Sequence, residues 1–260
     1  MGLALSGRRA LVTGASRGLG EAIARRLARD GAEVVLVART AKDLDRVAAS
    51  VRGSGGKAHV LAADVTDRAA CGRLAGAFIR EHGPVEILVN NAGGNVRKKA
   101  EQYSWEEWDR LVALALTAPF QWARLCFDGM RAKGYGRIVN VASVAGLTAL
   151  PTGAPYAAGK AGLIQLTRSL AREWGAHGIT VNAVAPWYVR TPLTEGVLAE
   201  PAFLASVLQA TPTGRLGTPE DVAAAVGFLV GPEAGWINGV CLPLDGGFSS
   251  SSFWPEAPRT

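Results

Sequence analysis

The sequence predicts a single α/β domain built on a parallel sheet of about seven strands with helices on both faces. Apolar, often Val-rich runs alternate with amphipathic stretches along all 260 residues, and this alternation is typical of strands joined through helices. Right-handed crossovers place such helices on both faces of the sheet, and no stretch has the composition of a linker. The expected architecture over residues 1–260 is therefore a Rossmann-type doubly wound sheet.

Local patterns predict the individual elements. Leu19, Ile23 and Leu27 recur at the spacing of one helix face, and Ser104 with Glu107 forms a capping box that opens a long helical region. Strands are expected at 10–13, 33–38, 57–63, 86–90, 136–142, 179–184 and 240–244. Helices are expected from residue 19 and at 41–51, 67–82, 104–131, 155–176 and 220–229, with short helices within 191–210. The Ser-rich run 249–252 is expected to begin a tail that leaves the sheet.

Composition narrows the class of protein. The three cysteines lie far apart, which argues against a disulfide framework, and no Cys/His cluster has metal-ligand spacing, so no metal is expected. The first residues lack the apolar core of a signal peptide, and no run approaches the length of a membrane span. We therefore expect a cytoplasmic protein with no membrane partner. The net charge of +6 is spread along the chain, and the basic run 97–99 is too short to indicate nucleic acid.

A glycine-rich turn follows the first expected strand. The segment from Thr13 to Gly20 reads TGASRGLG and leads directly into a helix. Glycines permit a tight turn and close backbone approach to a pyrophosphate, and the helix N-terminus offers free N–H groups and a positive dipole end. In this strand–turn–helix context the pattern indicates a dinucleotide site. We expect coenzyme contacts from Gly14, Ser16, Arg17, Gly18, Leu19 and Gly20.

The end of the second expected strand selects the coenzyme. An NAD site usually places an Asp or Glu there for the ribose 2′-hydroxyl, whereas this chain has Ala38-Arg39-Thr40. Arg39 would pair with a 2′-phosphate that a carboxylate would repel, and Arg17 in the glycine turn can approach the same phosphate. The sequence therefore predicts NADP(H) as the coenzyme.

Three side chains indicate proton-transfer chemistry. Tyr156 and Lys160 are spaced i, i+4 near the start of a helix, so they share one face. Ser143 follows the fifth expected strand, so all three are expected to meet at the carboxyl edge of the sheet. A phenol has a pKa of about 10; the ammonium of Lys160 and an oxidised nicotinamide are expected to lower it. The Ser143 hydroxyl would hold the substrate oxygen beside the phenol.

These motifs resemble those of the short-chain dehydrogenase/reductase family over nearly the whole chain. The shared features are the glycine turn, Asp64-Val65, Asn90-Asn91-Ala92-Gly93, Ser143, Tyr156 with Lys160, the Pro186 segment and Asp245-Gly246-Gly247. The resemblance implies that Asp64 lies near the adenine and that Lys160 also binds the nicotinamide ribose. It also implies a homotetramer and further coenzyme contacts from Val65, Asn91, Ala92, Gly93, Tyr156, Pro186, Val189 and Thr191.

Two segments narrow the resemblance to the tropinone-reductase-like branch. They are Asn95-Val96-Arg97-Lys98 and the run 185–195, which has Pro186-Trp187 where most relatives have Pro-Gly. One departure concerns the long fourth helix, where the family usually carries an Asn and this chain has Ala115. In the family that Asn supports a water that relays protons to the lysine, so we expect slower reprotonation of Tyr156 rather than loss of activity.

The insertion at about 187–212 is expected to cover the nicotinamide as a substrate lid. Trp187, Tyr188 and Leu193 are its expected substrate contacts together with Ser143, and Arg97 is the best candidate for meeting a substrate carboxylate. The leading interpretation is an NADP(H)-dependent reductase that converts a small-molecule ketone to a secondary alcohol. The alternatives are a 3-oxoacyl-carrier-protein reductase, a gluconate-type sugar-acid dehydrogenase, and an NADP(H)-sensing binding protein without turnover.

Overall fold

The computed structural model describes residues 4–150 and 153–250 and contains one seven-stranded parallel sheet. The strand order is β3-β2-β1-β4-β5-β6-β7, so the chain works outward from β1 to one edge, returns beside β1 and then works to the other edge. The strands are β1 (Arg9–Thr13), β2 (Glu33–Ala38), β3 (Ala58–Ala62), β4 (Ile87–Asn90), β5 (Gly136–Val141), β6 (Ile179–Pro186) and β7 (Cys241–Leu244). This topology confirms the predicted doubly wound fold.

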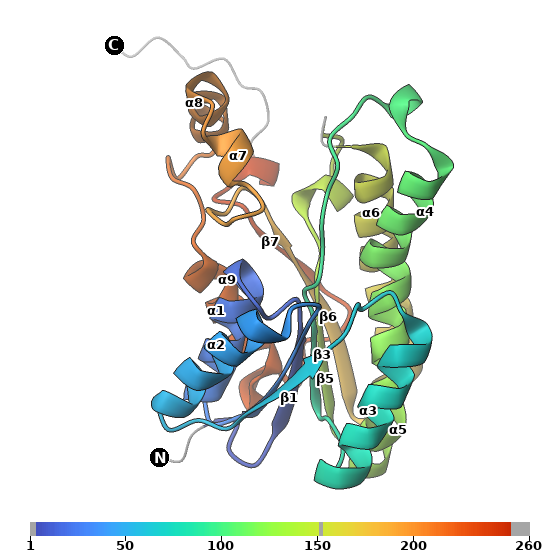
Figure 1. The fold of residues 1–260 in the computed structure, drawn as a ribbon. Coiled ribbons are helices and arrows are strands. Elements are labelled where there is room, and N and C mark those ends of the chain that lie inside the picture. The colour runs from blue at the N-terminus through green and yellow to red at the C-terminus, as the bar shows by residue number, and fades with distance from the viewer. Residues whose placement is uncertain (1–3, 151–152, 251–260) are drawn as a thin grey trace.

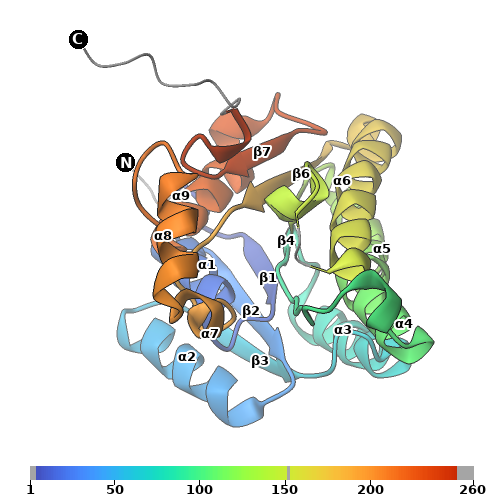
Figure 2. The ribbon, with the colours of Figure 1, turned by 90° about the horizontal axis from the view of Figure 1, so that it is seen from above.

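Helices cover both faces of the sheet (Figures 1 and 2). One layer holds α1 (Gly18–Arg29), α2 (Ala41–Gly53) and α9 (Pro219–Val230). The other holds α3 (Arg68–His82), α4 (Trp105–Val112), α5 (Ala118–Lys133) and α6 (Ala154–Trp174). The short helices α7 (Glu195–Leu198) and α8 (Pro201–Gln209) lie in the connection from β6 to α9. Of the tail expected from residue 249 onward, residues 249 and 250 belong to a 3₁₀ turn (Phe248–Ser250), and the remainder lies outside the described residues.

Both faces of the central strands are buried. In β1, Val12 packs in the core beneath α1 and α9, whereas its neighbour Leu11 packs in the core beneath α3 and α5. Successive side chains of a strand point to opposite faces, so a strand covered on both sides needs apolar residues at every position. This requirement explains why these strands read in the sequence as continuous apolar runs rather than as alternating ones.

The region 104–131, predicted as one long helix, is interrupted by a π-helical turn at Ala113–Thr117. Pro119 supplies the physical reason. It has no N–H to bond to the carbonyl of Ala115, and its ring would clash with that carbonyl in a regular α-helix. A π turn widens the helix at this point and separates α4 from α5. The boundary between α4 and α5 therefore follows from one proline, whose effect does not appear in the helical periodicity of the sequence.

The parallel strands bring their carboxyl ends to a single edge of the sheet. Thr13, Asn90 and Val141 end β1, β4 and β5, and Pro186 ends β6 at the same edge. The insertion with α7 and α8 lies over this edge (Figure 1). Within the described residues, no helix combines the length and apolar character needed to cross a bilayer, and no three His, Cys, Asp or Glu side chains are grouped to hold a metal ion.

Candidate active site

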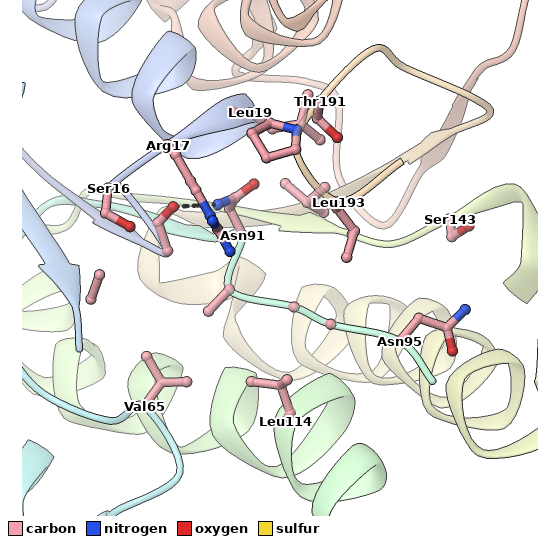
Figure 3. Close-up of a pocket in the computed structure, with 18 of the residues that line it drawn as sticks. Ser16, Arg17, Leu19, Val65, Asn91, Asn95, Leu114, Ser143, Thr191 and Leu193 are labelled. Carbon is pink, nitrogen blue, oxygen red and sulfur yellow. Dashed lines mark hydrogen bonds between the residues drawn. The ribbon is translucent and has the colours of Figure 1, made fainter. Parts of the chain in front are cut away.

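A cleft of about 550 Å³ runs along the carboxyl edge of the sheet. Figure 3 shows Ser16 and Arg17 of the glycine turn at one end, Val65 and Leu114 along one wall, and Ser143 at the opposite end. In open α/β sheets ligands bind beyond the carboxyl ends of the strands. The structure therefore brings the predicted coenzyme turn and the predicted catalytic side chains into one continuous space.

Nearly all of the residues predicted to bind coenzyme line this cleft. They are Gly14, Ser16, Arg17, Gly18, Leu19, Arg39, Asp64, Val65, Asn91, Ala92, Gly93, Tyr156, Lys160, Pro186, Val189 and Thr191. Gly20 is the exception. A Cβ atom at this position would press against the backbone of Gly14 and come within 2.5 Å of Nδ2 of Asn91. Gly20 therefore lets α1 approach the turn rather than forming part of the cleft wall.

The glycine turn is held against the strand beside β1. Gly14 adopts φ +66°, which favours glycine, and a Cβ there would lie only 2.9 Å from Cα of Ala92. The Thr13 hydroxyl accepts hydrogen bonds from the backbone N–H groups of Asn91 and Ala92, both at 3.0 Å. The Asn91 side chain donates in return to the carbonyls of Thr13 and Gly14. These contacts fix the position of the turn relative to the Asn-Ala-Gly segment.

The start of α1 suits an anion. Arg17 occupies the N-cap position without a side-chain hydrogen bond to the first turn of the helix. The first backbone N–H groups of α1 therefore remain available at the cleft, where the helix dipole is positive. Arg46 of α2 donates to the carbonyl of Ser16 at 3.0 Å and pairs with Glu21 of α1 at 2.6 Å. Sequence reasoning missed Arg46, which ties α2 to the glycine turn.

Arg39 lies at the same end of the cleft as Asp64. The Asp64 carboxylate accepts hydrogen bonds from the hydroxyl and the backbone N–H of Thr66, at 2.7 and 2.9 Å. These bonds hold the pKa of Asp64 below its usual value, and the nearby charge of Arg39 lowers it further. Asp43, in the first turn of α2, also lines this end of the cleft. The coenzyme prediction looked for a carboxylate only at the end of the second strand, so it did not include this one.

Ser143, Tyr156 and Lys160 meet at the opposite end of the cleft. Ser143 follows β5 and caps a 3₁₀ turn, its hydroxyl accepting from the N–H of Ala145 at 3.2 Å. That turn packs tightly on α6, since a Cβ at Gly146 would lie 2.7 Å from the carbonyl carbon of Lys160. The small residue at 146 therefore brings the Ser143 turn against the helix that carries the other two side chains.

Lys160 is 4% exposed, and its ammonium donates to the carbonyl of Val141 at 2.6 Å. Burial lowers the pKa of Lys160 to about 8. The Nζ atom lies 5.8 Å from the centroid of the Tyr156 ring. The bond to Val141 anchors the side chain beside the cleft, where it can reach a bound ligand as well as the phenol.

The surroundings of Tyr156 shift its pKa in both directions. Burial raises this pKa above its ordinary value. The largest opposing contributions come from the hydrogen bond with the Ser143 hydroxyl and from the charge of Arg97, rather than from the Lys160 ammonium. The lowering expected from Lys160 together with an oxidised nicotinamide concerns the enzyme with coenzyme bound, and it stays a prediction. The neutral phenol is the favoured form.

A buried polar network supports α6 from behind. Asn90 of β4 donates to Asn140 of β5 at 2.9 Å, and Asn140 donates to the Thr167 hydroxyl of α6 at 2.9 Å. All three side chains are buried. Buried polar groups left without a hydrogen bond are costly. This series of hydrogen bonds therefore fixes how α6 sits on the sheet and hence where Tyr156 and Lys160 lie.

The predicted substrate contacts Trp187, Tyr188 and Leu193 line a smaller recess that opens beside Ser143 and Tyr156. The Trp187 indole donates to the Thr211 hydroxyl at 3.2 Å and meets the Tyr188 ring edge-on, with centroids 4.6 Å apart. Tyr188 in turn contacts Phe203 of α8. Part of the aromatic content of the insertion thus packs the insertion together, and part of it faces the recess.

Several cleft residues were not predicted from the sequence. Thr40 and Thr66 line the cleft near Arg39, and Arg110 and Leu114 line it from α4 and the π turn. Thr40 could have been found from its place beside Arg39 at the end of β2. Arg110 and Leu114 carry no local signal, because only the packing of the α4–π–α5 unit brings them to the cleft.

Known proteins are similar to this chain over nearly its whole length. The family described as Enoyl-(Acyl carrier protein) reductase matches residues 14–249. A gluconate 5-dehydrogenase of Gluconobacter oxydans is 41% identical over 247 residues, 95% of this chain and 96% of that protein. A tropinone reductase homolog of Arabidopsis thaliana is 38% identical over 253 residues, 96% of this chain and 95% of that protein.

A solved structure has the same fold along its whole length. It is a gluconate 5-dehydrogenase from Burkholderia cenocepacia in complex with NADP and tartrate. It superposes with a TM-score of 0.93 at 34% identity and covers 96% of this chain and 98% of that chain. The likeness therefore extends over the sheet, both helix layers and the insertion.

Proposed function

The chain belongs to the short-chain dehydrogenase/reductase family of oxidoreductases, and we propose that it reduces a ketone to a secondary alcohol with NADPH. The observation that carries this proposal is one cleft with Arg17 and Arg39 at one end and Ser143, Tyr156 and Lys160 at the other. That separation suits a dinucleotide whose phosphates lie at the glycine turn and whose nicotinamide lies beside the phenol.

The coenzyme assignment to NADP(H) rests on charge. Arg17 and Arg39 both line the adenosine end, and β2 ends without a carboxylate at position 39. Guanidinium groups bind phosphate through charge-assisted hydrogen bonds, and the relative from Burkholderia cenocepacia is described with NADP bound. The coenzyme supplies the hydride when it is bound. We expect Arg39→Ser to weaken NADPH binding much more than NADH binding.

Tyr156 is the proposed proton donor. Because burial raises its pKa, the phenol stays protonated near neutral pH and can give its proton to the oxygen of the reduced carbonyl. The Ser143 hydroxyl, hydrogen-bonded to Tyr156, holds the substrate oxygen beside the phenol. Lys160 would bind the ribose next to the nicotinamide when the coenzyme is present, and its positive charge would favour return of the proton from solvent.

Oxidation of NADPH, followed by absorbance with a panel of ketones, tests the proposal. The panel contains cyclic ketones, keto-sugar acids and acetoacetyl thioesters, so it separates the tropinone-reductase-like reaction from the gluconate type and from 3-oxoacyl-carrier-protein reduction. Tyr156→Phe is expected to lose most turnover while it still binds NADPH. Tyr135→Phe is the matched control, because Tyr135 lies between Arg8 and Arg137 and lines neither cavity.

The outcome also separates an enzyme from a binding protein. If NADPH binds but no panel member is reduced, and Tyr156→Phe behaves like the wild type, the chain is an NADP(H) sensor and the proposal is wrong. We further propose a cytoplasmic homotetramer whose lid is the insertion at 187–212. Light scattering at several protein concentrations tests the tetramer, and a stable monomer would refute it.

A further inference from the structure

A small recess beside Tyr156 is the part of the site that can contact a substrate beyond its carbonyl group. Its volume is about 70 Å³, and it shares Ser143 and Tyr156 with the larger cleft. Asn95 lies at the same end of the cleft as Ser143, away from Arg17 (Figure 3). A space that begins at the proposed proton donor is where the part of a substrate beyond its carbonyl group has to lie.

Arg97 gives this recess its charge. Among the described residues it is the single cationic side chain on the wall of the recess, and no Asp or Glu lines that wall. The neighbouring Lys98 is paired with Glu107 at 2.6 Å, whereas Arg97 forms no ion pair within residues 4–150 and 153–250. Although burial raises the pKa of Tyr156, the Arg97 charge acts on that pKa in the opposite direction. The guanidinium is therefore close enough to influence the proton donor.

Trp187 forms a rigid apolar surface of the same recess. Its ring stacks on Phe248 with centroids 3.8 Å apart and an interplanar angle of 10°. Its one polar atom, the indole N–H, is already used by the Thr211 hydroxyl at 3.2 Å. Trp187 therefore offers a substrate an apolar ring and no free donor. Arg97 is left as the recess residue that can bind a charged group.

Building on the proposed function, we infer that Arg97 binds a carboxylate of the substrate, so that the enzyme acts on small oxo acids and the corresponding hydroxy acids. A guanidinium pairs with a carboxylate through two parallel hydrogen bonds, which fixes orientation as well as adding affinity. With the carboxylate on Arg97 and the carbonyl oxygen on Ser143 and Tyr156, the acid is held at two points. A neutral ketone is held at the carbonyl alone.

Matched acids and esters measure this recognition directly. The substrates are 3-oxobutanoate, 4-oxopentanoate and 5-oxohexanoate, each beside its methyl ester, with kcat/KM measured for both members of a pair. The wild type is expected to prefer the acid of at least one pair, and Arg97→Gln to reduce that preference by about 10- to 100-fold, the range for hydrogen bonds to charged groups. Arg97→Lys is expected to recover part of it.

Lys99→Gln is the matched control. It removes the same charge two residues along the same segment, and Lys99 is exposed and lines neither cavity. This variant is expected to keep the acid-to-ester ratio of the wild type. If Lys99→Gln lowers the ratio as much as Arg97→Gln, the effect is general electrostatics and the inference is overturned.

A binding measurement makes the result independent of turnover. Gluconate and its uncharged amide are titrated calorimetrically into the NADP⁺ complex of the wild type and of Arg97→Gln. Selective binding of the acid that disappears in Arg97→Gln supports the inference even if every ketone fails as a substrate, in which case only the proposed reaction falls. Reduction of ketones with equal preference for acids and esters leaves the reaction standing and refutes the role of Arg97.

Discussion

The hydroxyl of Thr13 offers the sharpest test of how the coenzyme cleft is built. Thr13 is 2% exposed at the end of β1, and its hydroxyl accepts two backbone hydrogen bonds at 3.0 Å, from Asn91 and Ala92. Replacement by Val keeps nearly the same shape and removes the hydroxyl alone. Thr13→Val therefore isolates the bonds that tie the glycine turn to the segment after β4.

The expected cost follows from the two N–H groups that lose their acceptor. A buried donor left unsatisfied costs about 1–3 kcal/mol. Asn91 and Ala92 are only half-buried, so water can partly replace the lost acceptor. The hydroxyl also donates to the carbonyl of Val89, but at 3.4 Å this bond is weak. We therefore expect Thr13→Val to lower the free energy of unfolding by about 2–4 kcal/mol and to weaken NADPH binding.

Urea unfolding of Thr13→Val beside Thr13→Ser separates the hydroxyl from the side-chain volume. The Ser variant keeps the acceptor and loses one methyl group, which costs about 1 kcal/mol. The Val variant keeps the volume and loses the acceptor. If Thr13→Val proves as stable as Thr13→Ser or more so, the two hydrogen bonds do not stabilise the cleft and the reasoning fails.

Three further changes test the glycine turn, the buried lysine and the π turn. Gly20→Ala is expected to destabilise the fold and weaken NADPH binding because the added Cβ collides with the Gly14 backbone. The control is Gly72→Ala, in open space on α3, which should raise the free energy of unfolding by up to about 1 kcal/mol. Equal urea midpoints for the two variants would contradict this. Burial lowers the pKa of Lys160 to about 8 from 10.5, so the unfolded chain binds this proton more tightly, and stability should rise with pH across that window. Between about pH 7 and pH 10 the unfolding free energy of the wild type should rise relative to that of Lys160→Met by most of about 3 kcal/mol. Parallel pH profiles of the two unfolding free energies would disprove this. Ala115→Asn is expected to raise turnover and change the solvent isotope effect, because it places a polar group at the π turn. If neither quantity changes, Ala115 does not slow the relay of protons to Lys160.

The sheet and helices could be predicted because their signals are local. The central strands are buried on both faces, so they appear in the sequence as apolar runs, and the observed β2 (Glu33–Ala38) has the predicted bounds. The π turn was missed because its cause, Pro119, lies in an otherwise regular amphipathic pattern. A single residue that removes one backbone hydrogen bond changes the helix without changing its periodicity.

The candidate site was predictable where its residues sit at strand ends. Topology alone carries the residues that follow β1, β4 and β5 to one edge, so their meeting needs no side-chain information. The role of Arg46 was not predictable, because its contact with the Ser16 carbonyl depends on how α2 packs beside α1. The effect of burial on the pKa of Tyr156 was not predictable for a similar reason, since it depends on how the surrounding elements pack.

The proposed proton transfer and the proposed substrate recognition depend on parts of the chain that are held very differently. Tyr156 and Lys160 sit on a helix fixed by the buried Asn90–Asn140–Thr167 chain of hydrogen bonds, whereas Arg97 lies exposed on a connecting segment and Leu193 is 51% exposed on the insertion. Changes at exposed positions seldom alter stability, so the recess can vary while the proton donor stays in place. Relatives of similar identity carry names as different as gluconate 5-dehydrogenase and tropinone reductase homolog, as we expect if substrate choice depends on such exposed positions. We therefore expect the walls of the recess, rather than the coenzyme end of the cleft, to decide which substrate is accepted.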